Sequence, residues 1–171
     1  PANRVLSYNV VLACHTSRGE VSCFLLKEKI INMEGREMFS IDYATEQDHD
    51  FWHTLDEYIS DDELTLKIRD QRCYIIKDDD RPVGVMRYNL FWDLIPFLTM
   101  IHFEQSYQGK GFGTKAMIHW ENEMRQLGHQ IAMTSTMVEE TSQHFYRKLG
   151  YKDCGCLIKD FPPYVETMEM F

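Results

Sequence analysis

Apolar and polar residues alternate with two different periods along this chain, and each period predicts its own kind of element. Alternation of period two predicts strands at 38–44, 72–77, 83–91, 97–104, 131–138, 151–159 and 165–171. Apolar residues three or four positions apart predict helices at 45–58, from 60 onward, at 111–127 and at 141–149. Thr45 and Ser60 are the expected N-caps of the first two helices, and Gly128 is expected to end the third.

The predicted order is β-α-α-β-β-β-α-β-α-β-β. Three consecutive strands followed by a helix do not fit a plain doubly wound sheet. We therefore expect an α/β (α+β) fold, with a mixed, largely antiparallel central sheet and helices on both faces.

The first 38 residues differ from the rest of the chain. The stretch VLSYNVVLAC is apolar, but only Arg4 precedes it, whereas a signal peptide has a more basic start and a clear cleavage site. We expect residues 39–171 to form the main domain and residues 1–38 to be an N-terminal appendage. That appendage is either an addition made for expression or a genuine extra hairpin or helix, packed on the domain or on a neighbouring chain of a homodimer.

Composition and net charge limit the kinds of molecule that the protein is expected to bind. A net charge of −9 argues against nucleic acid and favours a cationic substrate. No run of 18 apolar residues is present, which argues against a membrane span. The five cysteines are an odd number, which is typical of reduced thiols in a cytoplasmic protein. Cys154-Gly-Cys156 lacks a second pair at metal-binding spacing, so no metal is expected.

The stretch SYQGKGFGTKAM joins a predicted strand to a predicted helix, and it holds Gly109, Gly111 and Gly113 at alternate positions. A helix N-terminus offers unpaired N–H groups and a positive dipole end, and glycines let a bulky anion reach them. A phosphate or pyrophosphate is the natural ligand. The alternative is a turn that packs the helix tightly on the strand. Neither the P-loop pattern nor the dinucleotide pattern G-x-G-x-x-G is present.

A different pattern is matched. Residues 108–113 (QGKGFG) fit Q/R-x-x-G-x-G/A after the strand segment TMIHFEQSYQ, and the segment HFYRKLGYKDCG follows further on. Together the two segments resemble the GNAT superfamily of acetyl-CoA-dependent N-acetyltransferases. The resemblance covers residues 39–171, where the order of elements also matches, and the first 38 residues lie outside it.

The resemblance implies acetyl-CoA as co-substrate, with its pyrophosphate held by the backbone of the glycine segment. It implies that the strand ending at Phe103 pairs with the pantetheine arm, where that strand splays from the strand at 131–138. A main-chain N–H of this strand would also hold the acetyl oxygen. The cofactor-binding residues implied are Ile101, His102, Phe103, Gln108, Gly109, Lys110, Gly111, Phe112, Gly113 and Thr114.

Tyr146 matches the tyrosine of the second motif, which in the family commonly donates a proton to the departing CoA thiolate. The alternative role is packing beside Phe145 and Leu149. Two positions depart from the family pattern, because Glu139 stands where an Asn is frequent and Ser142 where an Ala is frequent. Glu139 is expected either to face the substrate amine or to begin the helix.

The general base is not assigned. The family positions that carry a Glu or His in some members are Phe97 and Thr99 here, and neither is a base. His102 and Glu104 lie on the other strand face by alternation. A water chain to bulk solvent would suffice to take the proton from an ammonium substrate.

Acidic residues are frequent in the segments expected to surround the acceptor amine. The stretch LDEYISDDEL and the last strand are acidic, and they form either a solvated face or an anionic rim that steers a cationic amine. Candidate substrate residues are Trp52, Asp61, Tyr88 and Glu139, with Tyr58 and Trp92 as further aromatic candidates. A polyamine, an aminoglycoside-like amine, and a peptide N-terminus or lysine all fit.

The main functional hypothesis is acetyl transfer from acetyl-CoA to a primary amine by direct attack in a ternary complex. The alternative from another class is a non-catalytic acyl-CoA-binding sensor on the same fold. A third hypothesis is a module that binds nucleotide phosphates.

Overall fold

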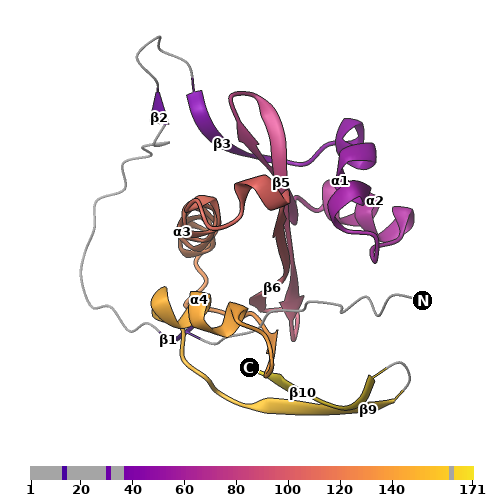
Figure 1. Cartoon of the computed structure of the whole chain (residues 1–171), viewed down its shortest axis with the longest axis vertical. Coiled ribbons are helices and arrows are strands. Elements are labelled where there is room, and N and C mark those ends of the chain that lie inside the picture. Colours follow the sequence, from indigo (N-terminus) through magenta and orange to yellow (C-terminus); the bar gives the residue numbers. More distant parts are fainter. Residues whose placement is uncertain (1–12, 15–29, 32–36, 162–163) are drawn as a thin grey trace. The chain divides into compact units, whose positions relative to one another are not determined.

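The computed structural model describes residues 13–14, 30–31, 37–161 and 164–171. Figure 1 shows its helices and strands coloured along the sequence, with labels on many of them. The strands are β1 Ala13–Cys14, β2 Ile30–Ile31, β3 Glu37–Tyr43, β4 Cys73–Asp78, β5 Arg81–Phe91, β6 Ile95–Phe103, β7 Ile131–Ala132, β8 Thr136–Met137, β9 Cys156–Phe161 and β10 Tyr164–Met170. The helices are α1 His49–Leu55, α2 Asp61–Arg69, α3 Phe112–Gln126 and α4 Ser142–Lys148, with single 3-10 turns η1 Glu46–Asp48 and η2 Gln105–Tyr107.

The described chain divides into two compact units. The N-terminal unit holds β2 and the chain from β3 to Arg87, together with Ile101–Trp120. The C-terminal unit holds Tyr88–Met100 and Glu121–Phe171, together with β1. The boundaries between the units fall within β5, β6 and α3.

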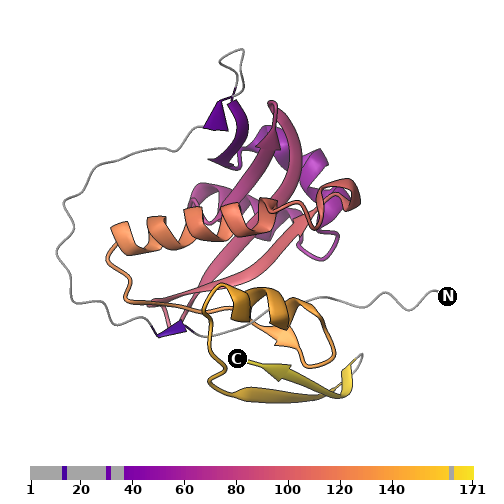
Figure 2. The ribbon, with the colours of Figure 1, turned by 60° about the vertical axis from the view of Figure 1, so that its left-hand side comes forward.

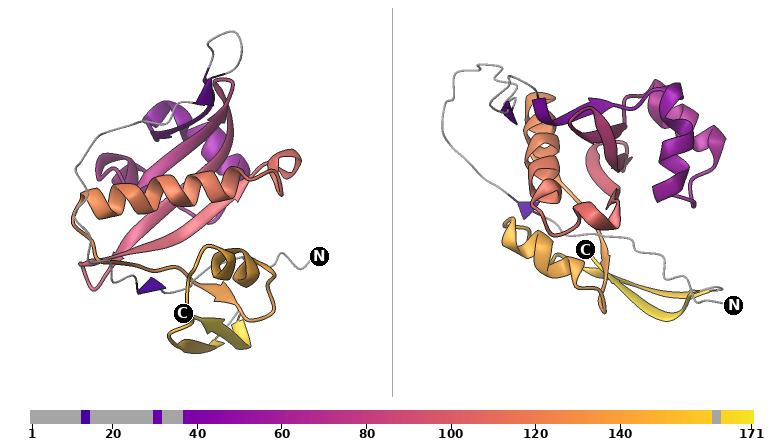
Figure 3. Two further views of the ribbon diagram at one scale, coloured as in Figure 1. Left: turned by 90° about the vertical axis from the view of Figure 1, so that its left-hand side faces the viewer. Right: turned by 45° about the horizontal axis from the view of Figure 1, so that its top comes forward.

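A mainly antiparallel sheet of order β2-β3-β4-β5-β6 supplies the strands of the N-terminal unit. Its antiparallel register sets Ser40 opposite Lys77 and Ile75 opposite Val85. Within this unit α1 and α2 lie on one face of the sheet and the first part of α3 lies on the other (Figures 1 and 3). Helices on both faces of a largely antiparallel sheet confirm the predicted fold class.

The core of the N-terminal unit forms where α1 and α2 cover the sheet. Trp52 and Leu64 have no exposed surface there, and they pack with Ile75 and Val85 of the two central strands. The predicted caps are present: the Asp48 carboxylate accepts hydrogen bonds from Thr45, and the Ser60 hydroxyl accepts one from the N–H of Glu63. Ser60 fixes where α2 begins, whereas Thr45 precedes the 3-10 turn η1 and α1 follows from His49.

Two tight turns connect the long hairpins. In the β4–β5 turn Asp79 and Asp80 have φ of 48° and 64°, and in the β5–β6 turn Trp92 and Asp93 have φ of 53° and 59°. Two consecutive left-handed residues match the right-handed twist of the flanking strands. The second turn directs Trp92 outward, where 80% of its surface is exposed.

The C-terminal unit has a different arrangement of strands. β8 comes before α4 in the chain, and β9 and β10 come after it. The three strands form a sheet of order β8-β10-β9, and Figure 2 shows α4 and the β9–β10 hairpin. β1 pairs with β7, and Phe97 of β6 forms a parallel bridge with Met133. The expected splay between the strand that ends at Phe103 and the segment 131–138 stays a prediction.

The predicted strand at 131–138 is wrong in one respect, because it divides into β7 and β8. The intervening residues form other contacts: the Met133 N–H donates to the Pro96 carbonyl, and the Thr134 hydroxyl donates to the Leu98 carbonyl. β8 then pairs with β10. The segment changes its partner strand, so no single ladder runs along it. β9 also begins at Cys156, five residues later than the predicted strand start at Tyr151.

The predicted boundary between residues 1–38 and 39–171 stays a prediction, because most of residues 1–38 lie outside the described residues. β2 pairs with β3, which itself begins at Glu37. None of the helices in the described ranges is long and apolar enough to cross a membrane.

Candidate functional site

The glycine segment forms the turn between β6 and α3. η2 ends at Tyr107, and Gly109 and Gly111 then adopt φ of 72° and 87°, a left-handed conformation that disfavours every other residue type. A Cβ added at either glycine would have no heavy atom within 4 Å. Packing of the protein therefore does not explain the missing side chains, and backbone conformation does. The space beside both glycines is open to a ligand.

The N-terminus of α3 presents donors to this open space. The first intrahelical bond runs from the N–H of Lys115 to the carbonyl of Gly111. The N–H groups of Phe112, Gly113 and Thr114 therefore have no partner within the helix. Together with the positive end of the helix dipole, they form a site suited to a phosphate group.

Side chains hold the turn against the end of β6. The Gln108 side-chain amide donates to the Phe103 carbonyl at 3.0 Å, which ties the beginning of the turn to the end of the strand. Phe103 in turn covers Gly84 of β5, where an added Cβ would lie 2.4 Å from its ring. The Phe103 ring can therefore lie against β5 only because residue 84 has no side chain.

Cationic side chains surround the same turn. The Nζ of Lys110 lies 5.5 Å from the centre of the Tyr107 ring, and the Nζ of Lys115 lies 4.9 Å from the centre of the Phe39 ring. Arg81 also faces Tyr107, and its guanidinium pairs with Glu104 at 2.7 Å. Glu104 therefore has a structural partner, and the two lysines add positive charge beside the helix terminus.

His102 is half-buried on β6, three residues before the 3-10 turn η2 begins at Gln105. Burial lowers the pKa of His102, and the charge of Asp56 opposes this shift. Burial therefore favours the neutral form of its imidazole. Ile101, beside it, is also partly exposed.

Tyr146 lies in α4 of the C-terminal unit and is completely buried. Its ring contacts those of Phe145 and Tyr151, with centroid distances of 5.0 and 5.7 Å. Tyr151 is similarly buried, and burial raises the pKa of its hydroxyl. The role of Tyr146 in proton transfer stays a prediction.

The turn before α4 contains a carboxyl group that sequence reasoning missed. Glu139 is exposed, whereas its neighbour Glu140 is partly buried and accepts hydrogen bonds from the hydroxyls of Ser142 and Thr136 at 3.0 and 3.3 Å. Burial raises the pKa of Glu140 despite these hydrogen bonds. A perturbed carboxyl group is often found at functional sites. In the sequence, the only sign of this environment is that Glu140 lies between Thr136 and Ser142.

We expect Glu140→Gln to change how stability depends on pH. Because the folded-state pKa of Glu140 is raised, the folded protein binds more protons, and stability falls as pH rises from about 4.3 through that folded pKa. The variant lacks this loss, so its stability relative to wild type should rise between pH 4 and pH 7. Denaturant unfolding at the two values measures this change. Glu139→Gln, at the exposed neighbour, should follow the wild type, and an equal response from both variants would contradict the assignment.

The predicted acidic rim is only partly exposed. Asp56 has no exposed surface, and its carboxylate pairs with Arg87 at 2.6 Å and accepts a bond from the Trp52 indole at 3.3 Å. Glu169 is also buried, pairs with Lys159 at 2.7 Å and accepts a hydrogen bond from Ser135. Asp56 and Glu169 are therefore structural ion-pair partners and not rim residues.

The other substrate candidates lie in different surroundings. Trp52 is completely buried in the core of the N-terminal unit, and Tyr88 is 6% exposed in the C-terminal unit, so both side chains pack inside the protein. Asp61 is highly exposed and accepts a hydrogen bond from His53 at 2.8 Å. Tyr58 is 45% exposed and remains accessible to an acceptor.

An apolar groove of about 310 Å³ lies in the C-terminal unit. Among its residues, Trp92 alone was a candidate substrate residue in the sequence, and Cys154-Gly-Cys156 was considered there only as a metal motif. The groove is lined by Phe91, Trp92, Ile95, Ile131, Met133, Cys154, Gly155, Cys156 and Phe171.

Comparison with known families decides what kind of protein this is. The model of the acetyltransferase (GNAT) family matches residues 32–151 of the 171-residue chain, which includes the glycine turn and Tyr146. The chain belongs to the GNAT acetyltransferase family. A search among curated proteins found no match.

Solved structures agree with the GNAT fold at low sequence identity. The ribosomal-protein-S18-alanine N-acetyltransferase from Escherichia coli superposes with a TM-score of 0.61 at 12% identity, covering 78% of this chain and 90% of that one. A mutant of the spermidine N-acetyltransferase SpeG from Vibrio cholerae gives 0.62 at 18% identity, covering 78% and 91%. N-acetylglutamate synthase from Neisseria gonorrhoeae, in complex with coenzyme A and N-acetyl-glutamate, gives 0.55 at 13% identity, covering 77% and 34%.

Proposed function

We propose that this GNAT protein transfers an acetyl group from acetyl-CoA to a primary amine of a small molecule or peptide, by direct attack in a ternary complex. The observation that carries the proposal is the glycine turn. Left-handed Gly109 and Gly111, the open space beside them and three N–H groups without helical partners form a cradle that fits a pyrophosphate.

Each part of the cradle has a separate role in the proposal. The N–H groups of Phe112, Gly113 and Thr114 would hold the pyrophosphate of acetyl-CoA, and the turn from Gly109 to Gly111 would supply further N–H groups. The backbone N–H of Gln108 already donates to the Gln105 carbonyl. Lys110 and Lys115 would compensate its charge from the flanks. Ile101, His102 and Phe103 would border the pantetheine arm, and a backbone N–H there would stabilise the oxyanion as the amine attacks.

The remaining steps are proton transfers. The ammonium form of the acceptor must lose a proton before it attacks, which a water chain to bulk solvent can accept. Tyr146 would give its hydroxyl proton to the departing thiolate and would recover one from the attacking nitrogen, which must lose a proton to become the amide. Acetyl-CoA supplies the activated thioester, and the products are the N-acetylated amine and free CoA thiol.

Related structures support an amine as acceptor but do not select one. The proteins named above act, by their names, on a protein alanine, on spermidine and on glutamate, which differ widely in charge and size. Partial burial of the acidic rim weakens the argument from charge alone. We therefore propose only the primary-amine class for this chain.

The decisive experiment incubates the protein and acetyl-CoA with a panel of amines. The measured quantity is the free CoA thiol released with each amine. The panel should include polyamines, aminoglycosides, lysine-containing peptides and peptides with free N-termini. Thiol release that depends on one amine class supports the transferase. Tight acetyl-CoA binding without turnover of any member would support the non-catalytic acyl-CoA sensor instead. ATP binding without CoA binding would favour the nucleotide-phosphate module.

The cradle makes its own prediction. We expect Gly113→Val to weaken CoA binding at least about tenfold, since a branched side chain in the first turn of α3 would fill the space beside the N–H groups. Calorimetric titration with CoA measures this loss. Gln126→Val, at an exposed position in the last turn of α3, controls for a β-branched residue in the helix. Unchanged CoA affinity in a folded Gly113→Val protein would contradict the cradle, and loss of folding would favour a packing role.

A further inference from the structure

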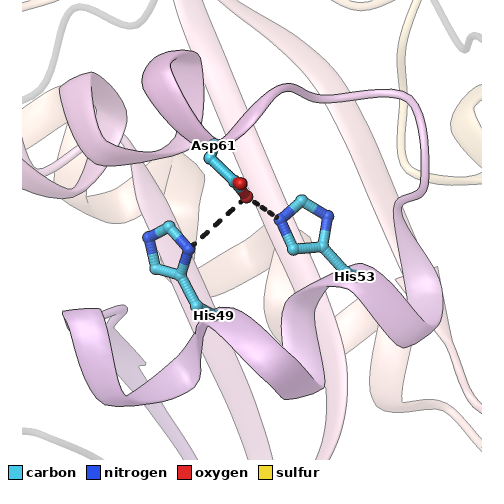
Figure 4. A group of neighbouring side chains, drawn as sticks. All are labelled: His49, His53 and Asp61. Carbon is cyan, nitrogen blue, oxygen red and sulfur yellow. Dashed lines mark hydrogen bonds and ion pairs between the residues drawn. The ribbon is translucent and has the colours of Figure 1, made fainter.

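Two histidines and an aspartate meet between α1 and α2 in the N-terminal unit (Figure 4). His49 and His53 stand one helical turn apart on α1, so both imidazoles lie on the same side of the helix. Asp61 is the first residue of α2, whose start is fixed by the Ser60 cap. The cap therefore helps to place the Asp61 carboxylate against α1.

The atoms of this cluster are arranged as metal ligands. One ligand atom from each side chain lies within 4.8 Å of the other two. The Asp61 Oδ1 is 2.8 Å from His53 Nε2 and 3.8 Å from His49 Nδ1. Tetrahedral bonds of about 2.0–2.1 Å would place ligand atoms about 3.3 Å apart. Small rotations of exposed side chains would bring the three atoms to that spacing.

We propose that His49, His53 and Asp61 form a binding site for a divalent transition metal of the zinc class. Two imidazoles and one carboxylate are ligands that Zn²⁺ accepts, and two histidines at i and i+4 on one helix recur in zinc sites. Three protein ligands leave one position for water or for a further ligand. The hard cations Mg²⁺ and Ca²⁺ prefer sets of oxygen ligands and fit this cluster poorly.

Surroundings of the cluster are compatible with reversible binding. The side chains of His49 and His53 are 25% and 33% exposed, and that of Asp61 is 80% exposed, so an ion can enter from solvent. Asp50 and Asp62 adjoin two of the ligands in sequence and lie on the exposed surface. Their charges would raise the local concentration of cations.

The metal would link α1 to α2 across the connection at 56–60. Both helices cover the same core around Trp52 and Leu64, so a bound ion would restrain the packing of that layer. Binding to the folded state alone stabilises it by mass action. The site would also change the role of Asp61, because a carboxylate bound to a cation no longer attracts a cationic amine. The metal site does not depend on the proposed acetyl transfer.

The test is a calorimetric titration of the full chain, without a histidine tag and treated with EDTA, with Zn²⁺ alone. We expect saturable binding of one equivalent and a rise in the thermal unfolding temperature with Zn²⁺. Both His53→Ala and Asp61→Asn should weaken the binding at least about tenfold, since each removes a ligand. With Co²⁺ in place of Zn²⁺, a visible absorption band of a tetrahedral site should appear in the wild type and disappear in both variants.

Matched controls separate this site from other ligands on the surface. Asp80→Asn and His144→Gln change an exposed carboxylate and an exposed histidine outside the cluster, and they should bind Zn²⁺ as the wild type does. Cys154 and Cys156 are exposed free thiols, so the titration is repeated in a Cys154→Ser, Cys156→Ser protein, where the binding should persist. Absence of saturable binding, binding that survives both ligand variants, or binding lost only with the thiols would each overturn the proposal.

Discussion

Replacing Tyr146 by phenylalanine is expected to lower the rate of acetyl transfer about a hundredfold, because general acid catalysis contributes about that much or more. The dissociation constant for acetyl-CoA should change little, since the ring and its packing against Phe145 and Tyr151 remain. Single-turnover kinetics with the best amine of the panel, together with calorimetry for acetyl-CoA, measure the two quantities separately.

Tyr151→Phe is the matched control for this variant. Tyr151 is also a buried tyrosine, and its ring contacts that of Tyr146, but the proposed mechanism gives it no proton to transfer. Its variant should keep a rate close to that of the wild type. A near-normal rate in Tyr146→Phe, or an equal loss in both variants, would reduce Tyr146 to a packing role.

A second large effect is expected in stability. Asp56→Ala should lower the free energy of unfolding by about 3–5 kcal/mol, since it removes the buried carboxylate that pairs with the guanidinium of Arg87. Arg87 is only 11% exposed, and the same substitution removes the acceptor of the Trp52 indole N–H. Denaturant unfolding of the wild type and the variant measures the difference.

Two further variants test whether loss of the buried ion pair causes this destabilisation. Asp62→Ala, at a neighbouring exposed acid, should change stability by less than about 0.5 kcal/mol. The double variant Asp56→Leu, Arg87→Met should recover much of the loss, because replacing both members of a buried pair by apolar residues is often neutral. A double variant less stable than Asp56→Ala would indicate that the hydrogen bonds to Asp56, and not its ion pair with Arg87, dominate.

Local chemistry made much of the fold predictable. Thr45 and Ser60 are the caps that the sequence indicated, and the residues around Asp79 form the expected hairpin turn. The segment at 131–138 was less predictable, since its apolar pattern is the same whether it pairs with one strand or changes partners. Only the bridge at Met133 and the ladder between β8 and β10 distinguish these cases.

In the candidate site, too, features set by neighbouring residues could be predicted, and features set by contacts between distant segments could not. Gly109 and Gly111 could be placed from sequence, because a left-handed turn before a helix requires glycine locally. Asp56 could not, since its neighbours Glu57 and Asp61 are exposed and only tertiary structure brings Arg87 to it. His49 and His53 have visible helical spacing, but Asp61 joins them only after the chain turns between α1 and α2.

The left-handed turn between β5 and β6 has a consequence for spectroscopy. Of the chain's three tryptophans, Trp52 and Trp120 have no exposed surface, whereas Trp92 at this turn is 80% exposed. An ionic collisional quencher in solution can therefore reach the fluorescence of Trp92 while the other two indoles are shielded. Trp92 also borders the apolar groove and stacks on Phe91, with ring centroids 4.7 Å apart. The protein thus carries an intrinsic optical probe beside that groove, and any molecule that enters it would protect this emission from the quencher.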